Sequence, residues 1–127
     1  SYSRQPARAA SARGCVMAET KRRPKVVKQK AFSTGISNSQ LERLALLSEE
    51  LGEAVQAIGK IMRHGYESRY PFAEAAKTNR QDLEKELGDV LAAIEILTRS
   101  RDLDEDAIAG HRNDKACRVH VYMHFQA

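Results

Sequence analysis

The sequence predicts an all-α fold, a helical bundle, from its composition and from the periodicity of its apolar residues. Hydrophobic residues make up 42% of the 127 residues, whereas Trp is absent and aromatic residues account for 6%. A core must therefore be built mainly from Leu, Ile, Val and Ala, which suits helices better than a β-sandwich. Two long segments also space their apolar residues by three and four, which is the period of an amphipathic helix.

The first helix is expected at roughly residues 40–64. Ser39 and Glu42 have the spacing of a capping box, with Ser39 as the N-cap residue. Gly65 follows the last apolar position and is a natural C-terminal cap. The apolar face is formed by Leu41, Leu44, Leu47, Leu51, Val55, Ile58 and Met62.

The second helix is expected at roughly residues 79–100, where Thr78 and Gln81 form another capping-box pattern. Its apolar stripe is so broad that contact with more than one neighbouring helix is expected. The connection over residues 65–78 is expected to hold a short helical turn near Phe72–Lys77.

A third helix is less strongly marked. Four acidic residues from Asp102 to Asp106 suit a helix N-terminus, and the helix is expected to run to about His120. Its apolar face is weak, and Gly110 lowers its intrinsic stability. The apolar ending Val119–Phe125 is expected to dock on the bundle.

The positive charge is concentrated at the N-terminus. Residues 1–30 hold nine of the 21 basic residues and one of the 17 acidic residues. We therefore divide the chain into a basic, flexible tail (1–37) and a helical domain (38–127). The tail supports an alternative hypothesis, a nucleic-acid-associated helical binding protein that acts through this segment, although a solvated charge run is the simpler interpretation.

Cysteine usage and hydropathy limit the location of the protein. Cys15 and Cys117 are far apart and form no metal-binding motif, which favours a reducing compartment and hence a cytoplasmic protein. No apolar run approaches the ~18 residues of a membrane-spanning helix.

Both long helices carry a pair of acidic residues three positions apart. Glu50 and Glu53 lie on the first helix, and Glu86 and Asp89 lie on the second. Each pair shares a helix face and borders the apolar stripe, so the carboxylates are expected to look toward a partner helix. Facing carboxylates repel each other unless a cation joins them, and Mg²⁺ prefers oxygen ligands. The alternative is that all four are solvated acids, since a single pair of this spacing is common.

A Gly residue, Gly52 or Gly88, precedes the second acid of each pair, which suggests close helix approach or room for a ligand. A di-iron bundle, the main competing metal site, requires Glu-x-x-His pairs. The sequence contains none.

Several basic and polar residues are candidates for substrate binding. Lys60 lies two turns after Glu53 and near the same face, and Arg63 follows one turn later. Asn79 can hydrogen-bond a base or sugar, or simply cap the second helix. Lys115 on the third helix can complete a phosphate pocket or lie on a solvated face.

The motifs Glu49-Glu50-Leu51-Gly52-Glu53 and Glu86-Leu87-Gly88-Asp89 resemble the signature of the MazG-like all-α NTP pyrophosphohydrolase superfamily, in particular its short, single-domain phage and mobile-element type. The resemblance implies hydrolysis of nucleoside triphosphates (NTPs or dNTPs) to a monophosphate and pyrophosphate. It also implies that the two acid pairs hold Mg²⁺, with Mn²⁺ as a substitute. Glu49 is then the candidate for orienting or deprotonating the attacking water, although a surface acid is an equally good interpretation.

The same resemblance implies a homodimer or a tetramer, because one short subunit leaves its broad apolar stripe uncovered. The 32 residues between Glu53 and Glu86 form a longer connection than many members of the superfamily have, so the base specificity stays open. A helical oligomer that has kept the fold and lost activity is a further alternative. The complete set of four acids argues against it.

Overall fold

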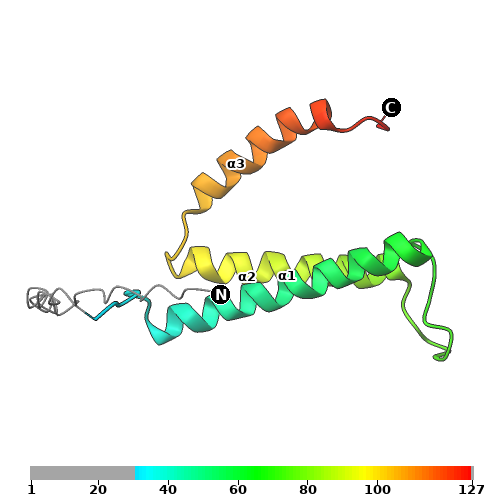
Figure 1. The fold of residues 1–127 in the computed structure, drawn as a ribbon, viewed down its shortest axis with the longest axis horizontal. Coiled ribbons are helices and arrows are strands. Elements are labelled where there is room, and N and C mark those ends of the chain that lie inside the picture. The colour runs from blue at the N-terminus through cyan, green and yellow to red at the C-terminus, as the bar shows by residue number, and fades with distance from the viewer. Residues whose placement is uncertain (1–30, 127) are drawn as a thin grey trace, which may run out of the picture. The chain divides into compact units, whose positions relative to one another are not determined.

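The computed structural model describes residues 31–126, and within this range the chain is all-α, as the sequence predicts. It contains α1 (Asn38–His64), α2 (Asn79–Arg99), α3 (Glu105–Arg118) and a 3₁₀ turn, η1 (Val119–Tyr122) (Figure 1). An isolated bridge between Arg69 and Thr78 is the β-type pairing that occurs in the described part of the chain. The basic segment 1–30 lies outside the described residues, and so does most of the predicted tail.

Helix α1 begins earlier than the sequence predicts. Ser37 is the N-cap: its side chain accepts a hydrogen bond from the Gln40 backbone N–H (3.2 Å), and the Gln40 side chain accepts one from the Ser37 N–H (3.0 Å). The prediction of Ser39 as N-cap was therefore wrong, because Ser37 and Gln40 form the same motif two residues upstream and satisfy the free backbone donors first. Gly65 ends the helix as expected, at φ 86°.

Helix α2 begins with the predicted capping box of Thr78 and Gln81 and ends at Arg99. Helix α3 starts after Asp104, whose side chain accepts from the Ala107 N–H, and no residue along its described length is buried. Asp102 is instead bound to α1, because Arg43 and Gln40 both donate hydrogen bonds to its carboxylate.

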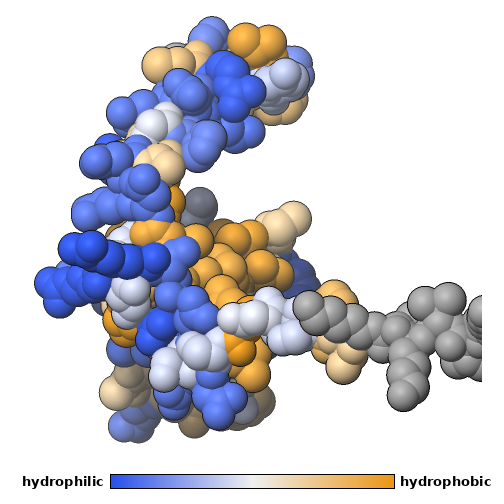
Figure 2. Space-filling model, turned by 90° about the vertical axis from the view of Figure 1, so that its left-hand side faces the viewer, coloured by the Kyte–Doolittle hydropathy of each residue, from blue (hydrophilic) through white to orange (hydrophobic). Residues whose placement is uncertain are grey.

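The core lies between α1 and α2, which run side by side in opposite directions (Figure 1). Its buried apolar residues are mostly small: Ala54, Ala57, Val90, Ala93 and Leu97. Most of the predicted apolar face is exposed instead, and Figure 2 shows a patch of hydrophobic side chains on the surface. The reason is geometric, since two helices bury only the narrow seam between them. The large exposed hydrophobic residues on α1 and α2 are Leu41, Leu44, Leu51, Val55, Ile58, Met62, Leu87, Leu91 and Ile96.

Two further expectations are not met. Val121, Tyr122 and Phe125 are 64–97% exposed, so the C-terminal segment does not dock on the pair of helices α1 and α2.

A Cβ atom at Gly52 or Gly88 would meet nothing within 4 Å, which excludes close approach of α1 and α2 as the reason for these glycines. The space beside each of them remains open.

The connection between α1 and α2 is organised mainly by backbone pairing. In place of the predicted helical turn near Phe72–Lys77 it has a hydrogen-bonded turn, in which the Ala76 N–H donates to the Ala73 carbonyl (3.2 Å). The backbone N–H groups of Asn79 and Arg80 donate to the carbonyls of Ser68 and Tyr66, each at 2.9 Å. The Arg80 guanidinium also lies over the Tyr66 ring, 4.5 Å from its centroid. These contacts hold the start of the connection against the first turn of α2.

Candidate functional site

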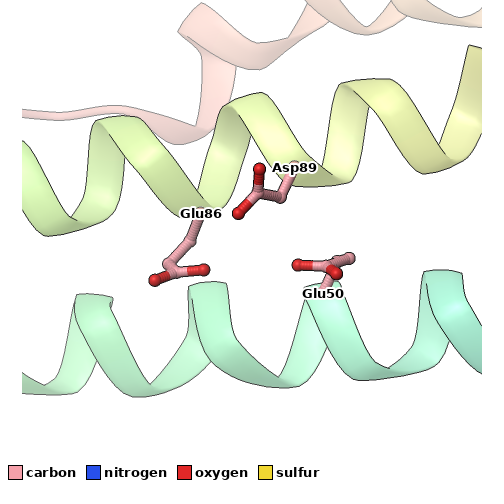
Figure 3. A group of neighbouring side chains, drawn as sticks. All are labelled: Glu50, Glu86 and Asp89. Carbon is pink, nitrogen blue, oxygen red and sulfur yellow. The ribbon is translucent and has the colours of Figure 1, made fainter.

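Three carboxylates from two helices form an acidic cluster. Glu50 lies on α1, and Glu86 and Asp89 lie on α2. One carboxylate oxygen from each lies within 4.8 Å of those of the other two, and all three residues are partly buried. Figure 3 shows Glu86 and Asp89 extending from α2 toward α1, with Glu50 directed back at them. We refer to these three residues as the acidic cluster.

Glu53 adjoins the acidic cluster through Glu86. Hydrogen bonding with Glu86 is the main reason that the pKa of Glu53 is raised above its usual value, and the negative charge of Glu86, burial and the charge of Glu50 act in the same direction. A proton shared between two carboxylates relieves their repulsion. All four acids that the sequence pattern singled out therefore lie together, three in the cluster and Glu53 at its edge.

Lys85 provides a positive charge at this site. Its Nζ donates to Asp89 at 2.8 Å and to both carboxylate oxygens of Glu86 at 3.2 and 3.3 Å. These hydrogen bonds, first that to Asp89 and then that to Glu86, raise the pKa of Lys85 above its usual value.

Two adjacent cavities lie near the acidic cluster, and the smaller one borders it through Glu86. The smaller, of about 260 Å³, is lined by Glu53, Gln56, Ala57, Lys60, Asp82 and Glu86. The larger, of about 580 Å³, lies between the end of α1, the connection and the start of α2. Lys60 and Asp82 line both cavities, so the two are neighbours.

The larger cavity is rich in basic residues. Its lining includes five side chains that carry, or can carry, positive charge: Lys60, Arg63, His64, Arg69 and Lys77. Tyr70 and Pro71 add apolar surface from the connection. We refer to this space as the basic cavity. Clustered cations beside a group of carboxylates suit a ligand that carries both a metal ion and phosphate groups.

The predicted substrate-binding residues fall into two groups. Lys60, Arg63 and Asn79 line the basic cavity, although the Asn79 side chain also donates to the Gly65 carbonyl (2.9 Å) and so fastens the connection. Lys115 is exposed on α3 and lines neither cavity. Glu49, the predicted catalytic residue, is exposed on α1 and is not part of the acidic cluster.

Sequence reasoning missed four residues of this region: Asp82, Lys85, Arg69 and Lys77. Two had a usable signal, because Asp82 precedes Glu86 by four positions and Lys85 precedes Asp89 by four, which places each pair on one helix face. Arg69 and Lys77 lie in the connection, where no periodicity indicates which way a side chain points. The contact of Arg69 with the Ala76 carbonyl (3.1 Å) depends on how the connection folds.

The chemistry of the donors fits a hard divalent cation. The cluster offers carboxylate oxygens and no sulfur or imidazole ligand, which favours Mg²⁺ or Mn²⁺ over zinc or copper.

None of the helices in the described range is long and apolar enough to cross a membrane.

Comparison with known proteins gives one match. The family model of the MazG nucleotide pyrophosphohydrolase domain matches residues 38–122, from the first residue of α1 to the last residue of η1. No curated protein and no solved structure matches the chain significantly.

Proposed function

The chain belongs to the MazG nucleotide pyrophosphohydrolase family, and we propose that it hydrolyses nucleoside triphosphates to a nucleoside monophosphate and pyrophosphate with the help of Mg²⁺. The observation that carries this proposal is the acidic cluster, in which Glu50 from one helix faces Glu86 and Asp89 from the other. Glu86 also lines the smaller cavity, which shares Lys60 and Asp82 with the basic cavity. The family match supports nucleotide pyrophosphohydrolase activity in general. The metal, the cleaved bond and the roles of the residues are our proposal.

The proposed metal ligands are Glu50, Glu86 and Asp89, with Glu53 as the fourth acid. A bound Mg²⁺ would neutralise negative charge on the phosphate oxygens and lower the pKa of the attacking water. The packing of α1 against α2 through the alanine-rich core sets the relative position of the two helices, and so fixes where their carboxylates lie. Mn²⁺ has the same preference for oxygen ligands and is expected to substitute.

The triphosphate is proposed to extend from the acidic cluster into the basic cavity. Lys60 lines both spaces, so its ammonium group can contact phosphate oxygens close to the cleaved bond. Arg63 lies deeper along the same helix and can bind the phosphates that leave as pyrophosphate. Asn79 lines the same cavity, where its side-chain amide donates to the Gly65 carbonyl, and its side-chain oxygen is proposed to accept a hydrogen bond from the substrate.

Glu49 remains our proposal for the residue that orients or deprotonates the attacking water. It directly precedes Glu50 in α1, and its side chain is exposed to solvent. Lys115 is proposed to bind phosphate from a neighbouring subunit, because it lines neither cavity of its own chain. A cytoplasmic location stays a prediction from cysteine usage.

The active form is proposed to be a homodimer or a tetramer. Leu51, Val55 and Leu91 are 47–68% exposed, and they are part of a wider apolar surface on both long helices. A contiguous apolar surface on a small chain marks a protein–protein interface more often than a solvent-exposed face. A second copy would supply the helices needed to complete a bundle.

The decisive experiment measures pyrophosphate release from a panel of NTPs and dNTPs with Mg²⁺, with Mn²⁺ and with EDTA. We expect metal-dependent release in the wild type and a loss of about 10²–10³-fold in Glu50→Gln, the cost typical of removing one group that stabilises charge in the transition state. Glu49→Gln tests the proposed role in water activation. The matched control is Glu42→Gln, which changes an exposed acid on the same helix two turns earlier.

Release of orthophosphate in place of pyrophosphate would contradict cleavage between the α and β phosphates. Wild-type activity in Glu50→Gln would contradict the assigned metal site. Activity of Glu49→Gln equal to that of Glu42→Gln would remove Glu49 from the mechanism and leave the metal site intact.

A further inference from the structure

Lys85 forms hydrogen bonds with two of the carboxylates that the proposed function assigns to the metal ion. Its Nζ makes three hydrogen bonds, to Asp89 Oδ2 (2.8 Å), Glu86 Oε2 (3.2 Å) and Glu86 Oε1 (3.3 Å). In the part of the chain that the structure describes, no other basic side chain forms an ion pair with Glu50, Glu86 or Asp89. The ammonium group therefore brings a positive charge to two of the three carboxylates of the acidic cluster.

The contact is not explained by helix geometry alone. Lys85 and Asp89 form an i, i+4 pair with the base on the N-terminal side, which is the weaker of the two orientations in a helix. The neighbouring carboxylates give the better reason, because Glu50, Glu86 and Asp89 place three ligand oxygens within 4.8 Å of one another and attract any nearby cation. Lys85 is the base whose flexible side chain reaches them.

The ammonium group is also free to leave. The Lys85 side chain is 49% exposed, whereas that of Glu86 is 15% exposed. Partly exposed ion pairs of this kind are weak, and the four-carbon stem of Lys can turn its charge into water without losing a proton. A divalent ion bound to the same oxygens would repel a positive charge held at hydrogen-bonding distance from them.

We propose that Lys85 is an internal counter-ion that occupies the acidic cluster in the metal-free protein and competes with the divalent metal for Glu86 and Asp89. The inference rests on the metal site of the proposed function and adds the residue that sets its affinity. Metal binding then requires the ammonium group to swing into solvent, where the phosphates of an arriving nucleotide offer it a new partner. The site would thus favour metal that arrives together with the triphosphate.

The test is the affinity of the nucleotide-free protein for Mn²⁺, measured from the electron paramagnetic resonance signal of the free ion at low salt. Lys85→Gln removes the charge and keeps a polar side chain, and we expect it to bind Mn²⁺ roughly tenfold more tightly. Lys85→Arg keeps the charge and is expected to stay within about threefold of the wild type. Circular dichroism confirms that each variant keeps its helical content.

Arg99→Gln is the matched control. It removes one positive charge from the same helix, but Arg99 pairs with Glu95 and not with the acidic cluster. A long-range effect of net charge would strengthen Mn²⁺ binding equally in both Gln variants, whereas direct competition predicts a change of less than about twofold for Arg99→Gln at this distance.

Equal affinities of Lys85→Gln and Arg99→Gln would overturn the inference and leave the metal site of the proposed function in place. Weaker binding by Lys85→Gln would also overturn it, because Lys85 would then be holding the carboxylates in the liganding arrangement. Absence of Mn²⁺ binding in the wild type and in every variant would overturn both this inference and the proposed metal site.

Discussion

Replacing Glu86 by Gln is expected to stabilise the metal-free protein and to weaken the metal-bound one. Glu86 lies at the centre of the charge arrangement: its carboxylate is within 4.8 Å of ligand oxygens of Glu50 and Asp89, and it bonds to Lys85 at 3.2 Å. Gln keeps the size and the hydrogen-bonding capacity of the side chain and removes its charge. The change therefore isolates electrostatic repulsion from packing.

The magnitude follows from these distances. Two unit charges at the 4.8 Å limit of this cluster repel by about 0.9 kcal/mol in bulk water, and by more if they lie closer. Opposite charges at 3.2 Å attract by about 1.3 kcal/mol. Two repulsions thus exceed one attraction by about 0.5 kcal/mol in bulk water, and by about 2 kcal/mol at the effective dielectric constant near a protein surface. We expect Glu86→Gln to stabilise the metal-free protein by about 1 kcal/mol, which raises Tm by about 5 °C in a domain of this size.

In saturating Mg²⁺ we expect Glu86→Gln to be less stable than the wild type, the opposite of the effect in the metal-free protein. A metal present at about 100 times its Kd stabilises the wild type by about 2.7 kcal/mol, and a variant that lacks one ligand loses most of this gain. Thermal melts followed by circular dichroism, in EDTA and in Mg²⁺, measure both effects on the same samples. Glu84→Gln is the control, because Glu84 is an exposed acid on the same helix outside the acidic cluster.

Either of two results would refute this reasoning. If Glu86→Gln melts below the wild type in EDTA while Glu84→Gln does not, the Glu86 carboxylate stabilises the hairpin and is not held under repulsion. An equal rise of Tm in Mg²⁺ for the wild type and Glu86→Gln would show that Glu86 is not a metal ligand.

Three further predictions concern the Asp102 carboxylate, Lys60 in the basic cavity and Lys115 on α3. Hydrogen bonds from Arg43, and to a lesser extent from Gln40, lower the pKa of Asp102 from its ordinary 3.8, so its contribution to stability is present above that value and is lost as the pH falls through the lowered pKa. Asp102→Asn should therefore lower Tm by about 5 °C at pH 7, and the difference from the wild type should close as the pH falls through the lowered pKa of Asp102. A difference that does not depend on pH would contradict this. In steady-state kinetics, Lys60→Gln should raise KM for the triphosphate about tenfold, the cost of one hydrogen bond to a charged group. Lys115→Gln should raise KM only if the assembly brings α3 to a neighbouring site, which comparison with the oligomeric state of the same sample decides.

The helices were predictable because their signals are local. Thr78 with Gln81 and Gly65 at the end of α1 act through backbone groups a few residues away, so reading the sequence placed these boundaries correctly. The error at Ser39 has the same origin, since two capping boxes overlap at the start of α1 and local rules do not rank them. In the structure it is Ser37 that has the extended backbone of an N-cap, at ψ 162°.

The sequence by itself also determined which acids share a helix face, because a spacing of three residues along a helix fixes their direction whatever surrounds it. Only the tertiary structure decided that Glu50 meets Glu86 and Asp89 while Glu53 joins them through Glu86, since this depends on how α1 and α2 are aligned along their axes. The same alignment decided that Ala54 and Ala57 are buried and that larger residues such as Leu51 are exposed. Contacts between residues far apart in the chain arise from the packing of whole faces, and periodicity within one helix contains no information about which part of its face the other helix covers.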